Sequence, residues 1–305
     1  MRARIILGHL TQVRVLCNYA IKHKKGESET HQMTNTGEKI IVCGLNGAGK
    51  STFGRALSKA LGYKFADIED YYFSPDDVTY SHPKSKEEVS KLLCGDITSN
   101  ENFILSAIKG DYGDDVSKAF TLAVFLDVPK DIRLSRVAER SAKRFGDRII
   151  PGRDLYQKEI EFFRTVEKRT ETIVADWLAK YDIPVIVLDG TNTVDENVTT
   201  FLNEYYSPKA GTVRTSLNKA ISRISLMENY FDTLERNLSR DPLTLKSEMW
   251  LNDMLRALND YYENGSWFYD YRLDEAGLLP KNMKRGVLSE DALYNFFSDA
   301  DKIFY

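Results

Sequence analysis

The stretch Lys39-Ile-Ile-Val-Cys-Gly-Leu-Asn-Gly-Ala-Gly-Lys-Ser-Thr52 decides the fold expected for this chain. The apolar run before its first glycine predicts a short buried strand. The run leads into Gly-x-x-x-x-Gly-Lys-Ser, the spacing of a phosphate-binding loop. Phe53, Leu57 and Leu61 follow at helical spacing, and Gly62 stands where a helix would end. The sequence therefore predicts a strand, a phosphate loop and a helix in succession.

The residue types of this loop suit a nucleoside triphosphate. Glycines let backbone N–H groups curl around phosphate oxygens, and a helix N-terminus adds partial positive charge. We expect Lys50 to act as a catalytic group on the β- and γ-phosphates and Ser51 to bind Mg²⁺, so the predicted cofactors are ATP and Mg²⁺. The nucleotide ligands predicted within the loop are Gly44, Asn46, Gly47, Ala48, Gly49, Lys50, Ser51 and Thr52.

Composition is ordinary for a globular protein. The chain has 305 residues, of which 42% are hydrophobic and 29% charged, and its net charge of -3 points to neither a nucleic-acid nor an anionic-membrane partner. Three widely spaced cysteines form no metal or disulfide pattern, which predicts a cytoplasmic location. No apolar run is long enough for a membrane span.

Residues 1–32 show no folding pattern. The basic and apolar start resembles a secretion signal, but Arg14 interrupts the apolar run and no cleavage site follows. We therefore interpret residues 1–32 as a disordered or non-native leader and expect Met33 to be the natural start.

Acidic residues follow the second predicted strand, in the stretch Tyr63–Asp70. In a parallel sheet these acids would lie at the carboxyl edge, beside the phosphate loop. Asp67 is predicted as the catalytic and Mg²⁺-binding acid, and Glu69 as the acid that faces the substrate. The alternative is a solvated acidic turn.

The third predicted strand is Asn102–Ala107, and arginines recur after the fourth, Phe120–Asp127. Arg136, Arg140 and Arg144 are four residues apart and share one face of a helix. We expect an arginine clamp on the transferred phosphoryl group, with Arg140 catalytic, in a mobile lid. The alternative is a solvated basic face.

The remaining elements complete the predicted domains. A long helix from about Leu155 to Lys180 precedes a fifth strand, Pro184–Asp189, and Thr191 lies in a turn where a nucleotide base could rest. This alternation predicts an α/β fold over residues 33–206, a five-stranded parallel sheet with helices on both faces.

A linker at 207–212 and an all-α domain at 213–305 follow. Its first helix carries a heptad seam, a second helix starts at Asp241-Pro242, and a last one spans about 289–304. We see no catalytic constellation here and expect packing on the first domain, on a second copy in a homodimer, or on a protein partner. The seam residues are Leu217, Ala220, Ile224, Met227, Phe231, Leu234 and Leu238.

Residues 39 to about 202 resemble the small phosphate-loop kinases, such as adenylate, shikimate and gluconate kinases. The resemblance implies that Asp67 serves Mg²⁺, that Glu69 serves the substrate, and that Arg140 and Arg136 contact phosphates. The stretches that carry it are Gly44–Thr52, Leu61–Glu69, Phe125–Pro129 with Arg136 and Arg140, and Val187–Thr191.

The chain departs from these families in the acceptor region. Residues 71–100 contain no arginine to grip an acceptor anion, although Lys84 is a candidate substitute. Ser106–Lys109 replaces the glycine triplet of shikimate kinases, and we expect the acceptor between Glu69 and Lys109. These departures leave the acceptor unidentified.

The C-terminal part, about 217–297, resembles a bacterial helical domain family of unknown function. The stretch that carries this resemblance is Gly277-Leu-Leu-Pro-Lys-Asn-Met-Lys-Arg-Gly-Val-Leu-Ser-Glu-Asp-Ala-Leu293. It implies no activity.

We therefore predict an ATP- and Mg²⁺-dependent kinase of a small hydroxylated metabolite or nucleotide. One alternative is a nucleotide-sensing module, in which ATP changes how the C-terminal helices bind a partner. A nucleic-acid end kinase is disfavoured by the net charge and by the lack of a broad basic stripe with interleaved aromatic residues.

Overall fold

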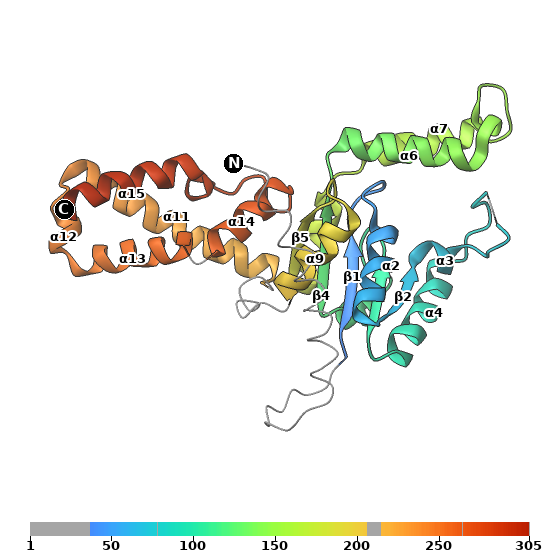
Figure 1. Ribbon diagram of the computed structural model, residues 1–305, viewed down its shortest axis with the longest axis horizontal. Helices are drawn as coiled ribbons and strands as arrows, with labels where there is room; N and C mark the ends of the chain where they lie inside the picture. The colour runs from blue at the N-terminus through green and yellow to red at the C-terminus, as the bar shows by residue number, and fades with distance from the viewer. Residues whose placement is uncertain (1–36, 78, 206–214, 264, 305) are drawn as a thin grey trace, which may run out of the picture. The chain divides into compact units, whose positions relative to one another are not determined.

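A parallel sheet forms the centre of the first part of the chain (Figure 1). The computed structural model describes residues 37–77, 79–205, 215–263 and 265–304; the predicted leader and linker lie outside them. The strand order is β2-β3-β1-β4-β5, and the predicted five-stranded parallel sheet is confirmed. The strands are β1 (Lys39–Cys43), β2 (Lys64–Asp67), β3 (Phe103–Ser106), β4 (Leu122–Asp127) and β5 (Val185–Asp189).

The sheet is buried on both faces, which explains why its strands are continuous apolar runs. Along β1, Ile41 and Cys43 belong to one apolar cluster, whereas Ile40 and Val42 belong to another on the opposite face. β1 pairs with β3 on one side and with β4 on the other. The loops that leave β1 and β3 therefore begin side by side at the carboxyl edge, where ligands bind in folds of this type.

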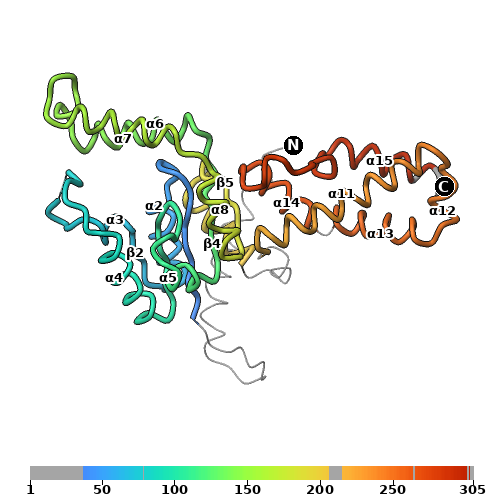
Figure 2. Tube along the Cα trace, turned by 180° about the vertical axis from the view of Figure 1, so that it is seen from behind, coloured from blue at the N-terminus to red at the C-terminus, as the bar shows by residue number. Residues whose placement is uncertain are grey.

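Helices cover both faces of this sheet. Side chains of α2 and α9 belong to one apolar cluster, and side chains of α4, α5 and α8 belong to the other. Helices α6 and α7 lie side by side in both views (Figures 1 and 2). The helices are α2 (Lys50–Leu61), α3 (Ile68–Tyr72), α4 (Lys86–Ser99), α5 (Asp114–Ala119), α6 (Lys130–Phe145), α7 (Tyr156–Lys168), α8 (Thr172–Tyr181) and α9 (Val194–Tyr205).

The prediction of one long helix from 155 to 180 is wrong. Helix α7 ends before Arg169, whose backbone is extended (φ -70°, ψ 137°), and α8 starts at Thr172. The Arg169 side chain leaves the helix direction and reaches Asn46 in the phosphate loop. No glycine or proline marks this break in the sequence. The contact between Arg169 and Asn46 that accompanies the break is long-range, and the local sequence pattern does not predict it.

The C-terminal part is helical, and the predicted seam is buried along most of its length. The second predicted helix is interrupted after one turn, because Glu248 is extended between α12 and α13. Within the described residues, no helix is long and apolar enough to cross a membrane. The helices are α11 (Leu217–Arg240), α12 (Thr244–Ser247), α13 (Met249–Glu263), α14 (Ser266–Glu275) and α15 (Glu290–Phe304).

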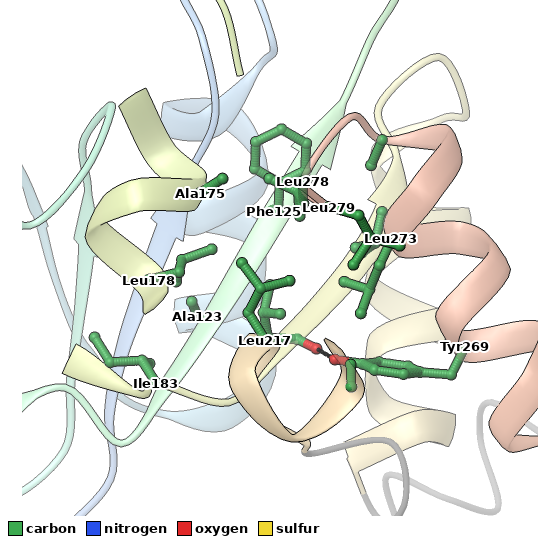
Figure 3. Packing of buried hydrophobic residues seen from close by; sticks show 14 of the residues in the cluster. Ala123, Phe125, Ala175, Leu178, Ile183, Leu217, Tyr269, Leu273, Leu278 and Leu279 are labelled. Carbon is green, nitrogen blue, oxygen red and sulfur yellow. Dashed lines mark hydrogen bonds between the residues drawn. The ribbon is translucent and has the colours of Figure 1, made fainter. Parts of the chain in front are cut away.

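One apolar cluster joins the C-terminal helices to the sheet (Figure 3). The Tyr269 hydroxyl on α14 lies within hydrogen-bond distance of the carbonyl oxygens of Val185 and Thr215. The C-terminal helices thus help to bury one face of the sheet beside β4 and β5. The cluster residues labelled with Tyr269 are Ala123, Phe125, Ala175, Leu178, Ile183, Leu217, Leu273, Leu278 and Leu279.

We expect Leu273→Ala to lower the free energy of unfolding by about 2–5 kcal/mol, because it leaves a cavity at a fully buried position. Leu243→Ala is the matched control, since Leu243 is 68% exposed, and it should change stability by less than about 0.5 kcal/mol. Urea unfolding of the full chain measures both. Equal losses in the two variants would contradict a joint core at Leu273.

Candidate nucleotide and acceptor site

The phosphate loop connects β1 to α2 and contains backbone that only glycine adopts easily. Gly47 and Gly49 have φ values of 83° and 89°, and α2 begins directly after Gly49. A Cβ atom on Gly47 would lie 2.3 Å from the carbonyl oxygen of Arg133. The loop therefore rests against the first turn of α6 with no room for a side chain at position 47.

A cavity of about 560 Å³ lies where the phosphate loop meets the ends of β2 and β3. It brings together residues that are far apart in the sequence, including most of the predicted nucleotide ligands and both predicted acids. Its lining residues are Asn46, Gly47, Gly49, Lys50, Ser51, Thr52, Asp67, Ile68, Glu69, Tyr72, Ser106, Ala107, Ile108, Tyr112, Arg136, Arg140 and Arg169.

Three arginines that line this cavity have no acidic partner among the described residues. Within the described residues, no carboxylate oxygen lies within 4.0 Å of a guanidinium nitrogen of Arg136, Arg140 or Arg169. One Arg136 nitrogen donates to the Gly190 carbonyl oxygen (3.1 Å), which joins α6 to the loop after β5. Guanidinium groups that converge on a cavity without internal ion pairs suit a bound anion such as phosphate.

Lys50 lies among charges of both signs. Its Nζ atom donates to the carbonyl oxygen of Leu45 (3.0 Å). Burial lowers the pKa of Lys50 to about 8, while the carboxylates of Asp67 and Glu69 oppose this shift and the Arg140 charge adds to it. Neutral and charged forms of Lys50 therefore coexist near pH 8 in the free protein.

The predicted Mg²⁺ ligands, Ser51 and Asp67, both line the cavity. Asp67 is buried and accepts a hydrogen bond from the Glu69 N–H (3.2 Å), and the Ser51 hydroxyl is 3.4 Å from that of Ser106. Among the residues described, no group of three or more histidine, cysteine or acidic side chains could hold a metal. One carboxylate and one hydroxyl, completed by phosphates and water, fit the usual environment of Mg²⁺ beside a nucleotide.

Arg169 is the main site residue that sequence reasoning missed. It donates to the Asn46 side-chain oxygen (2.5 Å) from the junction between α7 and α8. Burial lowers its pKa, although not enough to remove the charge of an arginine. The predicted absence of an acceptor arginine concerned residues 71–100 only; Arg169 lies about seventy residues beyond that stretch and lines the cavity. 

Several predicted binding residues do not line the cavity. Gly44 and Ala48 shape the loop, and four side chains have partners elsewhere. Their roles stay predictions. The four side chains are Arg144, over the ring of Tyr80 (3.9 Å); Thr191, on Asp189 (2.6 Å); Lys84, on the carbonyl of Tyr71 (3.5 Å); and Lys109, beside Asp111 (3.3 Å).

The C-terminal motif Gly277–Leu293 is held by structural hydrogen bonds. Arg285 donates to Asp274 (2.5 Å), and the Val287 N–H donates to the buried carboxylate of Glu228 (2.7 Å). The Val287 carbonyl accepts from the Trp267 indole (2.9 Å). These contacts tie the motif to α11 and α14, which accounts for its residue types without any reaction.

Fold and site together define the class of small phosphate-loop kinase domains. Residues 40–161 match the family model described as an AAA domain, and residues 224–305 match the domain of unknown function DUF4298. The chain is 32% identical over 169 residues to the uncharacterized protein YqaC of Bacillus subtilis (strain 168), covering 53% of this chain and 93% of YqaC. The chain belongs to the family of YqaC. In this chain, a shikimate- and gluconate-kinase-like phosphate-loop domain is followed by DUF4298.

Two further similarities involve named kinases. A shikimate kinase of Clostridium beijerinckii is 26% identical over 138 residues, 41% of this chain and 80% of that protein. The crystal structure of a gluconokinase from Sinorhizobium meliloti 1021 matches with a TM-score of 0.37 and 16% identity, over 54% of this chain and 89% of that chain.

We expect Gly47→Ala to abolish nucleotide binding. We also expect it to lower the stability of the fold more than Gly62→Ala does. Both residues have a left-handed backbone, which costs alanine about 1–2 kcal/mol, but only position 47 faces a carbonyl at 2.3 Å, while position 62 is open. Thermal unfolding and calorimetric titration with ATP measure the two effects. Matching losses of stability would show that the Arg133 contact does not matter.

We expect nucleotide affinity to fall as the pH rises above about 8, by up to about tenfold per pH unit. The sign follows from the pKa of Lys50, because the lysine is charged below about pH 8 and phosphates bind the charged form. Calorimetry from pH 7.5 to 9.5 measures the affinity. The control is Lys50→Arg, which stays charged; an equal slope in this variant would rule out Lys50 as the titrating group.

Proposed function

We propose that this chain is an ATP- and Mg²⁺-dependent phosphotransferase that acts on a small hydroxylated acceptor. The observation that carries the proposal is the charge arrangement of one cavity. A lysine on the phosphate loop and three arginines without acidic partners in the described chain share it with the two carboxylates Asp67 and Glu69. Cations suit the transferred phosphoryl group, and carboxylates suit an attacking hydroxyl.

The nucleotide would occupy the phosphate-loop end of the cavity. Backbone N–H groups of the loop, the N-terminus of α2 and Lys50 would bind its phosphates. Ser51 and Asp67 would hold Mg²⁺, which would neutralise charge on the phosphates when bound. Arg136, which already contacts the Gly190 carbonyl, would lie between the phosphate loop and the side where the base is predicted to rest.

The acceptor would occupy the other end, beside Glu69, Tyr72, Tyr112 and Arg169. Glu69 would orient the acceptor hydroxyl, and Asp67 or Glu69 would take its proton as its oxygen bonds to the γ-phosphorus and the bond to the ADP oxygen breaks. Arg169 favours an acceptor that carries a carboxylate or phosphate group, because its guanidinium can pair with such an anion.

A nucleotide-sensing module is the second candidate, and one chain of contacts favours it. The Arg133 carbonyl touches the phosphate loop, and its side chain pairs with Glu171 (3.3 Å). Glu171 in turn lies beside Gly277 in the C-terminal part, where an added Cβ would be 3.8 Å away. A change at the phosphate loop could therefore reach the C-terminal helices.

We expect ADP release from Mg·ATP to rise by about a hundredfold or more when the correct acceptor is added, since positioning an acceptor hydroxyl provides at least that much. The panel contains nucleosides, nucleoside monophosphates, shikimate, gluconate and related sugar acids. Lys50→Ala should bind ATP no better than background and should show no turnover, while its circular-dichroism spectrum stays unchanged.

The control for the acceptor half is Arg169→Lys, which keeps the charge but loses the planar guanidinium. For an anionic acceptor it should raise the KM for the acceptor more than the KM for ATP. A flat panel with tight ATP binding would reject the phosphotransferase and favour the sensing module. Unchanged turnover in Lys50→Ala would reject the proposed phosphotransferase site, and unchanged ATP binding in this variant would reject both candidates.

A further inference from the structure

Tyr80 connects the predicted acceptor carboxylate to the predicted lid. Its hydroxyl donates to Oε2 of Glu69 (3.0 Å), and the guanidinium of Arg144 lies 3.9 Å from the centre of its ring. Glu69 lines the cavity, whereas Arg144 is at the end of α6 and does not. The Tyr80 side chain therefore hydrogen-bonds to an acid of the proposed acceptor end and stacks on an arginine of the predicted lid at the same time.

The loop around Tyr80 is also held by helix α7, which lies beside α6. The Lys158 ammonium on α7 donates to the carbonyl oxygens of Thr79 (2.8 Å) and Tyr80 (3.0 Å) and to the Ser81 hydroxyl (2.9 Å). Tyr80 has φ 53°, a backbone conformation that a tyrosine rarely adopts. Contacts from α3, α6 and α7 thus fix Tyr80 in an unfavourable conformation, so its position depends on tertiary structure.

Arg144 differs from Arg136 and Arg140 on the same helix face, because it does not line the cavity. Arg136 and Arg140 line the cavity, but Arg144 lies about 6 Å further along the helix and stacks on Tyr80 and on Phe145. An arginine has a long flexible stem, so Arg144 could turn toward the phosphates if the ring of Tyr80 moved away. In the present conformation, stacking opposes that movement.

An acceptor hydroxyl and the Tyr80 hydroxyl compete for the same carboxylate. Both are neutral O–H donors to Glu69, so replacing one with the other exchanges one hydrogen bond for a similar one. An acceptor hydroxyl can therefore replace the Tyr80 hydroxyl on Glu69 without a net loss of hydrogen bonds, whereas the phosphate oxygens of ATP are acceptors and cannot donate to that carboxylate.

We propose that Tyr80 is an acceptor-sensing latch, which holds the lid arginine Arg144 away from the nucleotide until an acceptor hydroxyl replaces the tyrosine on Glu69. This inference rests on the proposed phosphotransferase function. Tyr80 then has a positioning role, because its side chain acts through Arg144. The Arg144 guanidinium would reach the phosphates only when an acceptor is present.

Nucleotide affinity of the full chain tests the latch without an acceptor. We expect Tyr80→Phe, which removes the hydroxyl contacts to Glu69 and Arg144 but keeps the ring, to tighten binding of a non-hydrolysable ATP analogue with Mg²⁺ by about threefold to tenfold. Tyr80→Leu, which also removes the stacking ring, should gain at least as much. Tyr181→Phe is the control, because it removes a comparable hydroxyl bond to Asp114 (2.6 Å) far from the lid and should change nothing.

The role of Arg144 is tested by a double-mutant cycle. In an Arg144→Met background, Tyr80→Phe should bring no gain, since the arginine it would release is gone. ATP hydrolysis without an acceptor should rise in Tyr80→Phe and not in the double variant. Unchanged or weaker analogue binding in both Tyr80 variants, or an equal gain in the Arg144→Met background, would overturn the latch.

These outcomes are separate from those of the acceptor panel. If no acceptor in the panel raises ADP release but Tyr80→Phe binds the analogue more tightly, the proposed acceptor chemistry is rejected. The contact between Tyr80 and Arg144 would then still control nucleotide affinity. With a productive acceptor, wild-type affinity for the analogue should rise to that of Tyr80→Phe, and failure to rise would overturn acceptor sensing.

Discussion

The close contact between the phosphate loop and the first turn of α6 is the constraint on which the site depends. Gly47 meets the carbonyl of Arg133 where any side chain would collide. The Arg133 side chain is buried and continues inward to the Val128 carbonyl (3.0 Å) and to Glu171 (3.3 Å). Glu171 lies two residues from Arg169, the arginine that returns to the loop through Asn46. One set of contacts thus shapes the phosphate loop and also brings Arg169 to the cavity.

Charges of both signs share this cavity. Lys50 and three arginines line it together with the carboxylates of Asp67 and Glu69, and Glu69 accepts a hydrogen bond from Tyr80. Arg136 and Arg169 are partly buried and Arg140 is exposed, and none of the three has an acidic partner in the described chain, so their charges can pair with an anionic ligand. The C-terminal helices contribute differently, because they bury one face of the sheet beside β4 and β5 and supply structural hydrogen bonds through Tyr269.

Sequence reasoning succeeded where local pattern and chemistry coincide. The five strands, the helix after the phosphate loop and the α11 seam were predicted because their apolar periods match the faces they bury. It was less successful for long side chains, whose reach depends on tertiary structure. Lys84 and Lys109 were chosen for their charge, yet the structure gives them partners outside the cavity, while Arg169 enters it from an unmarked helix break.

By itself, the sequence determined the class of fold and the phosphate-binding end of the site. Strand, loop and helix are contiguous there, so the spacing of Gly44–Ser51 already specifies which backbone and side-chain groups meet. Only the tertiary structure decided the acceptor end. Glu69, Tyr80, Arg144 and Arg169 come from separate segments, and their distances depend on how α3, α6 and α7 pack around the sheet. Local periodicity carries no information about such distances, because it reports only which face of each element is buried.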